Sequence, residues 1–392
     1  MKTIAVVGVG TVGVISLAHF LTYMPDDFKI VSIHDPNIPI FGIGESTPIN
    51  PPDIFYRAGD WSLFESEDEL DATVKFGIKY TNWREHDIFS HVSPPSYGIH
   101  LNNFKIKDVM FPRFQKKWKE KFEIVEAKIT DLKNVDNMVD VVTDKGTFTY
   151  DYVVDCRGWP ESYDDYVISN AAPLNSCLVQ MVPEPGTWNY THHIAHENGW
   201  MFGIPLKTRQ GWGYLYNDTI TTREEAESHI KQLFNKDEVN LKEFKFKNFY
   251  SKKPLEGRII KNGNRIMFME PLEGFSGSYY YRVCQVFTDF IYGVMSEERV
   301  NEQLVWDAQD AENVMAFIYH GGSKFDTPFW KMAKEKTGNH LKNNERFERY
   351  IVGDINNSNR IQRLTEIRSP LSMRLWENHD RSFGYHYFTP KD

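Results

Sequence analysis

The chain has 392 residues, a length that allows one elaborate domain or two closely joined domains around a large core. Its 54 acidic and 45 basic side chains are interspersed and give a formal net charge of −9, which argues against a nucleic-acid-binding surface. No apolar run is long enough to span a membrane, and three widely spaced cysteines predict neither a disulfide framework nor a thiolate metal site.

The first predicted unit is a strand, a tight turn and a helix. Residues 4–7 are apolar and mostly β-branched, which predicts a buried parallel strand, and residues 14–21 suit a helix packed on a sheet. The glycines between them have the spacing G-x-G-x-x-G and predict a dinucleotide site at the helix N-terminus; a purely structural turn is the alternative. The expected cofactor contacts are Gly8, Val9, Gly10, Val12 and Gly13. The first strand leaves no room for a signal peptide, so we expect a cytoplasmic protein.

Two further segments complete the predicted cofactor site. Residues 29–35 read as a second strand, and Asp35 at its end is the acid placed to bind the ribose hydroxyls. Residues 38–48 contain two glycines and two prolines, too close together for a helix or a strand interior. They predict a loop folded against a ligand, with a simple connecting turn as the alternative.

These segments together resemble the opening of the flavin-dependent halogenases of the tryptophan-halogenase type. The shared pattern is G-x-G-x-x-G followed by I-P-x-x-G-x-G-E-[SA]-T. The resemblance implies an α/β fold in which a Rossmann-like FAD-binding domain of the GR2 flavin monooxygenase type is interleaved with a β-sheet and helical substrate domain. The implied cofactor lobe comprises residues 1–60, 120–165 and 255–295, and the implied substrate lobe comprises residues 61–119, 166–254 and 296–392. The second segment is expected to lie along the flavin, with contacts from Gly44, Glu45, Ser46 and Thr47.

The next predicted strand carries the candidate catalytic lysine. Residues 74–83 alternate between apolar and polar, which predicts a strand with Val74, Phe76, Ile78 and Tyr80 on its core face. From the alternation alone, Lys75 and Lys79 on the other face read as ordinary solvent-facing lysines. Halogenases carry K-x-x-[IV]-[KR]-[FY]-x-N-W here, and the resemblance implies that Lys75 is catalytic and Lys79 is not.

The middle of the chain offers fewer functional candidates. We expect residues 99–101 to enter an amphipathic helix, residues 123–150 to form a β-meander, and residues 152–158 to be a buried strand ending in a glycine turn. Cys156 in that last segment reads as a small packed side chain rather than a nucleophile, because no base stands beside it.

A cluster of three histidines follows, at positions 192, 193 and 196. His192 and His196 would have the spacing of a metal pair on a helix, but the tyrosine and threonine before them favour a strand. We therefore expect no metal site.

Residues 199–206 resemble the W-x-W-x-I-P motif that marks this halogenase family against related flavin monooxygenases. The matching positions, expected near the active site, are Trp200, Phe202, Ile204 and Pro205. Phe202 stands where the motif has its second tryptophan, so it keeps an aromatic plane and lacks the indole N–H.

Residues 267–278 resemble the family's E-P-L-E-S-T-G-I segment, which carries the second catalytic group and the halide site. The resemblance implies Glu273 as the catalytic carboxylate, Ser276 and Gly277 as halide contacts, and Ser278 as a cofactor contact. This chain has an apparent extra residue after Glu273 and lacks the small-residue turn that usually precedes the motif over the flavin. Residues 318–330 resemble the helix and D-T-P-F-W loop that close the substrate side.

The resemblance implies an FADH2-dependent halogenase. A separate flavin reductase would supply reduced FAD, O2 and halide would give hypohalous acid, and Lys75 would direct it onto an electron-rich aromatic small molecule. The insertion that covers the substrate in tryptophan-specific halogenases is missing, so we expect a more open pocket. A flavin monooxygenase or a non-halogenating FAD-binding relative is the alternative, favoured by Phe202 and by the altered turn from Glu273 to Ser278. The joint presence of Lys75 and Glu273 favours the halogenase. Neither a nucleic acid nor a membrane is an expected partner, and a homo-oligomer is left open.

Overall fold

The computed structural model describes residues 1–40, 42, 44–84, 86–91, 97–342 and 344. For Ser90, His91 and Glu273 it describes the backbone alone. One prediction lies outside these residues: the C-terminal part of the substrate lobe, residues 345–392. None of the helices in the described ranges combines the length and the apolar character needed to cross a bilayer.

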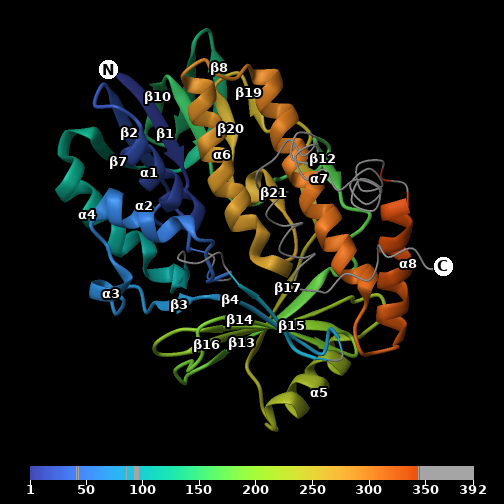
Figure 1. The fold of residues 1–392 in the computed structure, drawn as a ribbon. Helices are drawn as coiled ribbons and strands as arrows, with labels where there is room; N and C mark the ends of the chain where they lie inside the picture. Colours follow the sequence, from blue (N-terminus) through green and yellow to red (C-terminus); the bar gives the residue numbers. More distant parts are fainter. Residues whose placement is uncertain (41, 43, 85, 92–96, 343, 345–392) are drawn as a thin grey trace, which may run out of the picture.

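Helices and strands alternate in the first half of the chain, and longer helices follow in the second half (Figure 1). The helices are α1 (Thr11–Tyr23), α2 (Asn50–Gly59), α3 (Leu63–Ser66), α4 (Ile106–Trp118), α5 (Arg223–Phe234), α6 (Phe275–Ile291), α7 (Glu297–Gly321) and α8 (Pro328–Lys342), with short 3-10 helices η1 (Asn103–Lys105), η2 (Lys119–Lys121), η3 (Gly263–Arg265) and η4 (Leu272–Gly274). The strands are β1 (Lys2–Val7), β2 (Phe28–His34), β3 (Thr73–Lys75), β4 (Gly77–Thr81), β5 (Ile88–His91), β6 (Gly98–His100), β7 (Phe122–Glu126), β8 (Ile129–Val135), β9 (Met138–Thr143), β10 (Gly146–Tyr150), β11 (Tyr152–Asp155), β12 (Tyr166–Ile168), β13 (Ser176–Val182), β14 (Thr191–His196), β15 (Gly199–Pro205), β16 (Gln210–Tyr216), β17 (Leu241–Lys245), β18 (Phe249–Ser251), β19 (Leu255–Glu256), β20 (Ile259–Lys261) and β21 (Met267–Phe268).

The N-terminal strand lies in the middle of a six-stranded sheet with the order β19-β20-β11-β1-β2-β7. All its pairs are parallel except β19 with β20. Ile4 pairs with Tyr152 on one side and with Ile30 on the other. Residues 4–7 are fully buried, as the β-branched run predicts for a strand covered on both faces. The predicted strand, turn and helix at the N-terminus, and the α/β class, are confirmed.

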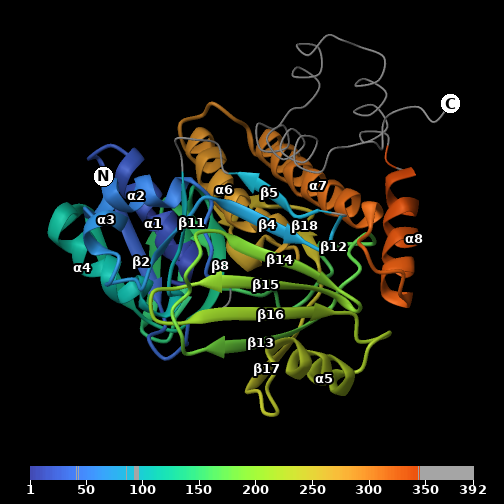
Figure 2. The ribbon, with the colours of Figure 1, turned by 60° about the horizontal axis from the view of Figure 1, so that its bottom comes forward.

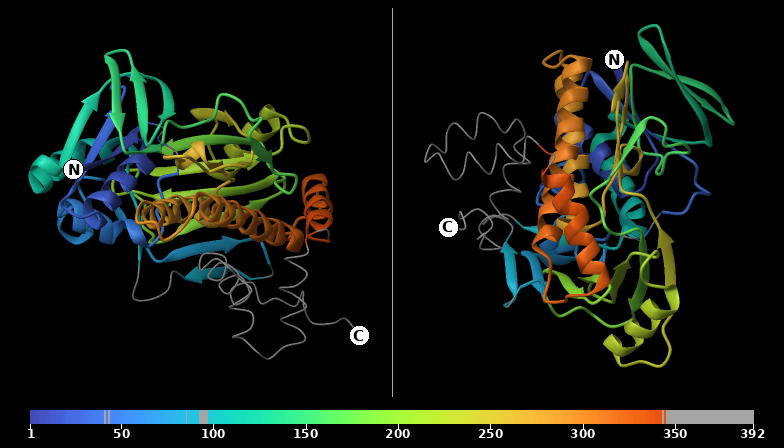
Figure 3. Two further views of the ribbon diagram at one scale, coloured as in Figure 1. Left: turned by 90° about the horizontal axis from the view of Figure 1, so that it is seen from above. Right: turned by 90° about the vertical axis from the view of Figure 1, so that its right-hand side faces the viewer.

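The predicted meander is present but shorter than expected. Strands β8, β9 and β10 form an antiparallel sheet of three strands, which projects from the body near the N-terminus (Figure 3). The first part of the predicted segment, β7, instead joins the parallel sheet beside β2.

A seven-stranded sheet with the order β17-β13-β16-β15-β14-β4-β5 forms the second layer (Figure 2). Alternate side chains of β15 and β16 point to opposite faces. On one face Trp200, Phe202 and Leu215 pack with residues of α7 and α8, whereas on the other face Met201 and Tyr214 pack with residues of α5. Strand β15 is therefore buried along its whole length.

Two predictions from local pattern are wrong. The predicted strand over residues 74–83 breaks at Phe76: β3 pairs with β6, whereas β4 pairs with β14 and β5. Phe76 is 43% exposed rather than on the core face, and Lys75 is only 6% exposed rather than in solvent. Residues 99–101 do not enter a helix, because β6 ends at His100 and the helix α4 begins at Ile106.

Candidate active site

The glycine turn after β1 has the geometry of a dinucleotide-binding turn. Gly8 has φ +91°, and a Cβ there would lie 2.7 Å from the carbonyl oxygen of Cys156; a Cβ on Gly13 would lie 2.0 Å from the oxygen of Gly8. The first and third glycines therefore allow the turn and the close packing of helix on strand. Gly10, the N-cap of α1, faces open space, with no atom within 4 Å of a Cβ built on it, and no side chain caps the helix. The turn thus leaves room for a phosphate at the N-terminus of α1.

Other predicted cofactor positions surround this turn or share its open character. Gly44 has positive φ and faces open space, and so does Gly158 in the glycine turn after β11, which was not predicted as a cofactor contact. Val12 packs against Gly263, where a Cβ would lie 3.3 Å from the valine. Asp35 directly follows β2, beside the end of β1, and accepts hydrogen bonds from the backbone N and Nδ2 of Asn37. The residues present fit the FAD implied by the fold, because open space beside glycines of three segments suits a long phosphate-bearing ligand.

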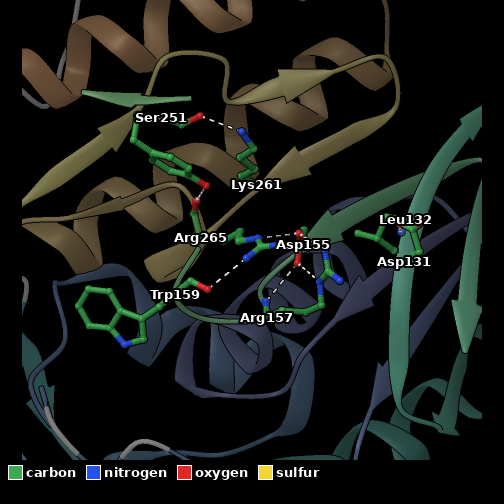
Figure 4. A network of polar contacts seen from close by, with 9 residues as sticks. Asp131, Leu132, Asp155, Arg157, Trp159, Ser251, Lys261 and Arg265 are labelled. Carbon is green, nitrogen blue, oxygen red and sulfur yellow. Dashed lines mark hydrogen bonds and ion pairs between the residues drawn. The ribbon is translucent and has the colours of Figure 1, made fainter. Parts of the chain in front are cut away.

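A buried carboxylate holds the turn after β11. Asp155, 4% exposed, accepts hydrogen bonds from Nε and Nη2 of Arg157 at 2.8 and 2.9 Å and from Nε of Arg265 at 3.2 Å (Figure 4). Burial alone would raise the pKa of Asp155, but the hydrogen bonds and charge of Arg157, together with the charge of Arg265, hold it below its ordinary value. Arg265 Nη1 also donates to the carbonyl of Trp159. This cluster ties η3 to the Cys156–Gly158 turn beside Gly8.

Lys75 lies at the junction of β3 and β4, buried between the two layers. Its Nζ donates a hydrogen bond of 2.8 Å to Oγ of Ser46. The same nitrogen lies 3.7 Å from the point where a Cβ on Gly274 would stand. The fold therefore brings together the lysine of β3, the Gly44–Thr47 segment and the turn after Glu273. Lys79 differs, because its side chain is 32% exposed and forms an ion pair with Asp87 at 2.9 Å.

The start of α6 lies beside this lysine. Gly274 has φ +61° and caps the helix without a side-chain hydrogen bond, so Ser276, Gly277 and Ser278 occupy the first turn. A Cβ on Gly277 would lie 2.8 Å from Cδ of Pro48, which places the helix start against the Gly44–Thr47 segment. A helix N-terminus and a buried ammonium group both favour an anion. Glu273 belongs to η4, directly before this turn, and the structure describes only its backbone.

The motif strand β15 contacts the site through two hydrogen bonds. Nε1 of Trp200 donates to the hydroxyl of Tyr319 in α7 at 2.7 Å, and the carbonyl of Pro205 accepts from Oγ1 of Thr73 in β3 at 2.7 Å. The ring of Phe202 covers Gly213 of β16, where a Cβ would meet it at 2.1 Å. Ile204 is buried in the core between β15 and α7. Replacement of the motif's second tryptophan by Phe202 is therefore accommodated by packing.

Glu270, which sequence reasoning did not single out, is a buried acid at the start of the E-P-L-E segment. It is 1% exposed and accepts a hydrogen bond from the hydroxyl of Tyr319. Its Oε2 has no hydrogen-bond partner within the described part of the chain. Burial raises the pKa of Glu270 to about 8, although the hydrogen bond from Tyr319 opposes the shift. The chain from Trp200 through Tyr319 to Glu270 anchors the turn that carries Glu273.

We expect Glu270→Gln to flatten the pH dependence of stability. The ordinary pKa is 4.5 and the folded value about 8, so the folded protein keeps a proton that the unfolded chain releases between these values. The free energy of unfolding of the natural chain should therefore fall as the pH rises from 4.5 to about 8. Thermal unfolding at pH 5 and pH 8 should show a smaller loss of Tm in the variant. Equal losses in both proteins would mean that Glu270 does not take up this proton.

A buried ion pair lies under the Gly44–Thr47 segment. Glu45 is 2% exposed, and its two carboxylate oxygens accept hydrogen bonds from Nη1 and Nη2 of Arg209. Burial raises the pKa of Glu45, while the hydrogen bonds and charge of Arg209 counter the shift. The side chain predicted to contact the cofactor thus binds Arg209, in the turn between β15 and β16.

Arg209→Met should destabilise the fold by about 3 kcal/mol, because it leaves a buried carboxylate without its partner. The double variant Glu45→Gln/Arg209→Met should recover most of that loss, since no charge then stays buried alone. Urea unfolding of the single and double variants measures both values. A double variant no more stable than Arg209→Met would show that the ion pair is not the source of the effect.

The remaining candidates of the sequence analysis have structural roles. The three histidines lie on β14, as the strand prediction requires, and among the described residues no group of three or more His, Cys, Asp or Glu side chains could hold a metal ion. His196 stacks on Tyr214 with ring centroids 3.8 Å apart. Burial raises the pKa of the Cys156 thiol well above its ordinary value, which is the reverse of what a nucleophile needs.

Comparison with known proteins gives one consistent family. The family model for tryptophan halogenase matches residues 3–125 and 90–351. Tryptophan 6-halogenase ThaL of Streptomyces albogriseolus is 24% identical over 449 residues, covering 90% of this chain and 82% of that protein. Tryptophan 7-halogenase RebH of Lentzea aerocolonigenes is 23% identical over 423 residues, covering 85% of this chain and 78% of its own length.

The solved structures agree on the fold. The crystal structure of a tryptophan halogenase from Shewanella frigidimarina superposes with a TM-score of 0.76 at 16% identity, covering 98% of this chain and 94% of that one. The two matched ranges span the glycine turn, Lys75, the motif strand and the E-P-L-E segment. The chain therefore belongs to the tryptophan halogenase family of flavin-dependent enzymes.

Proposed function

We propose that this protein is an FADH2-dependent halogenase that forms hypohalous acid from O2 and halide and transfers the halogen to an electron-rich aromatic small molecule. The observation that carries the proposal is the position of Lys75. Its ammonium group is buried, lies next to Gly274 at the start of α6, and is held by Ser46 of the predicted flavin segment. An electrophile formed beside the flavin would meet this nitrogen before it reached solvent.

The proposed cofactor lobe comprises residues 1–60, 120–165 and 255–295. Two parts of this lobe would hold FAD. The glycine turn at Gly8, Gly10 and Gly13 would take the pyrophosphate, and Asp35 the ribose hydroxyls. Gly44, Ser46 and Thr47, with Ser278 opposite, would lie along the ring. When bound in its reduced form, the flavin supplies the activation of O2 that oxidises the halide. The cofactor would arrive from a separate flavin reductase.

Three groups of this chain would then handle the halide and the oxidant. The first turn of α6, at Ser276 and Gly277, would hold the halide through its backbone N–H groups and the helix dipole. Lys75 would bind the hypohalous acid by hydrogen bonding or as a haloamine and so keep it pointed at one face of the substrate ring. Glu273 would remove the ring proton from the cationic intermediate.

The substrate is proposed as a phenol, an indole or a small heteroaromatic compound rather than as free tryptophan. Relatives of this chain are named for halogenation of tryptophan at positions 6 and 7. The family resemblance implies that the substrate lobe proposed for this chain, residues 61–119, 166–254 and 296–392, lacks the insertion that covers the substrate in tryptophan-specific halogenases. A monooxygenase that transfers oxygen rather than halogen is not favoured, because it has no use for a lysine beside an anion-binding helix start.

Mass spectrometry of a mixed pool of phenols and indoles tests the proposal. The protein is incubated with FAD, a flavin reductase, NADH and O2, with chloride, bromide or iodide supplied separately. We expect a halogenated product whose halogen follows the halide added. A protein that binds FAD but gives no halogenated product with any of the three halides would overturn the proposal.

A further inference from the structure

A chain of hydrogen bonds runs from Lys75 into the buried core between the two layers. Nζ of Lys75 lies 2.8 Å from Oγ of Ser46, which lies 3.4 Å from Oγ1 of Thr191 in β14. Oγ1 of Thr191 lies 3.0 Å from Nε2 of His100 in β6. The other ring nitrogen, Nδ1 of His100, lies 3.2 Å from Oγ1 of Thr73, which donates to the carbonyl of Pro205 at 2.7 Å. His100 is completely buried and Thr191 is 5% exposed.

The direction of every bond in this chain is fixed by its two ends. The carbonyl of Pro205 can only accept, so the single hydroxyl proton of Thr73 is used there. Thr73 must then accept from Nδ1–H of His100, which leaves Nε2 as an acceptor for the hydroxyl of Thr191. By the same count, the hydroxyl proton of Ser46 goes to Thr191, and Ser46 accepts from Lys75. The contact between the hydroxyls of Ser46 and Thr191 is the longest of the chain, at 3.4 Å. Each hydroxyl along the path donates one hydrogen bond and accepts one.

We propose that His100 is a positioning residue that fixes the nitrogen of Lys75 through a one-way chain of hydrogen bonds, with Ser46 and Thr191 as its links. The chain requires an uncharged His100 that is protonated on Nδ1. Burial, and secondarily the charge of Lys75, holds the pKa of His100 well below its ordinary value, so the ring is neutral at working pH. Sequence patterns gave no sign of this role.

The direction of these hydrogen bonds affects the nitrogen of Lys75. Because Ser46 can only accept from Lys75, it does not occupy the lone pair of the neutral amine. When a hypohalite anion meets the ammonium group, one N–H proton moves to the hypohalite oxygen and gives the amine and hypohalous acid. An N–X bond then forms, the O–X bond breaks, and a second N–H proton leaves with the hydroxide as water. This consequence rests on the proposed function, whereas the tautomer of His100 does not.

Nitrogen NMR of protein labelled with heavy nitrogen in histidine tests the tautomer without any turnover. The His100 signals are assigned by their loss in His100→Gln. We expect the proton on Nδ1 and a bare Nε2 in the natural chain. A proton on Nε2 would reverse the chain and overturn the proposal.

The variants Thr191→Val and Thr191→Ser test the effect on the reaction. Valine keeps the shape of threonine and removes only the hydroxyl, whereas serine restores the hydroxyl. We expect Thr191→Val to lower kcat about 10-fold, the size of one lost hydrogen bond in a buried network, without a matching change in KM. It should also release more free hypohalite to a chemical trap, and Thr191→Ser should restore kcat.

The outcomes separate this proposal from the proposed function. If the natural chain halogenates and Thr191→Val is equally active, or if Thr191→Ser is as impaired as Thr191→Val, the positioning role is wrong. If the natural chain gives no halogenated product at all, the proposed function fails, and the NMR result alone decides whether the hydrogen-bond chain exists.

Discussion

Lys75→Met should abolish halogenation, with a loss of at least about 100-fold in kcat, while FAD affinity and Tm stay close to those of the natural chain. Lys75 is only 6% exposed, and methionine keeps an unbranched side chain that fills most of the same buried space. The substitution removes the nitrogen that lies beside Gly274. A loss in kcat of this size is typical when a group that stabilises the reacting atoms in a buried site is removed. The measurement is steady-state product formation with saturating halide, together with FAD titration by fluorescence.

Lys79→Met is the matched control, because Lys79 lies on the neighbouring strand β4, 32% exposed and paired with Asp87. It should keep nearly all activity, since exposed ion pairs contribute little. A fully active Lys75→Met would remove Lys75 from the mechanism. A variant that lost FAD binding together with activity would instead indicate a structural role for the lysine.

Gly10→Val should bind FAD about 10- to 100-fold more weakly without unfolding the protein. Gly10 has φ −63° and extended ψ, which any residue adopts, and no atom lies within 4 Å of a Cβ built on it. The added side chain therefore enters the space where a pyrophosphate would approach the turn. Crowding of one branched side chain costs about 1–3 kcal/mol, which corresponds to this loss of affinity.

Gly13→Ala provides the contrast to Gly10→Val. Its Cβ would lie 2.0 Å from the carbonyl oxygen of Gly8, so α1 cannot keep its place against β1. We expect a marked loss of Tm in the cofactor-free protein, which Gly10→Val should not show. Isothermal titration with FAD and thermal unfolding separate the two effects. If Gly10→Val binds FAD as tightly as the natural chain, the phosphates are bound elsewhere.

The parts of the fold that follow from local pattern were predictable. The β1, α1 and β2 unit depends on a β-branched run, three spaced glycines and an apolar helical stretch, all within the first 35 residues. The surface helix α5, Arg223–Phe234, begins at a capping box of Thr222 and Glu225 that the sequence already contains. Such signals need no distant partner.

The environment of Lys75 was not predictable from the alternation of residues 74–83. Strand pairing decides it: β3 pairs with β6 and β4 with β14, so the chain crosses from one sheet to another at Phe76. A period of two carries no information about such a crossing. The family resemblance identified the lysine, while its burial comes from segments far away in the sequence.

The polar contacts around the site were missed for the same reason. Arg209 lies 164 residues from Glu45, and Thr191 lies 91 residues from His100. Each of these side chains is unremarkable in its own segment, and only the fold brings the pairs together. The signal that could have found Glu270 is the E-P-L-E segment itself, whose first acid stands in a run otherwise apolar enough to be buried.

The fate of the oxygen atoms of O2 tests most directly whether the protein is a halogenase. The enzyme is run with reduced FAD, bromide, a phenol or indole that it accepts, and isotopically heavy O2, and the product is examined by mass spectrometry. A halogenase places bromine on the ring and sends the oxygen of O2 to water, so we expect the two-isotope pattern of bromine and no heavy oxygen in the product. A product that carries heavy oxygen and no bromine would contradict the account and identify a monooxygenase.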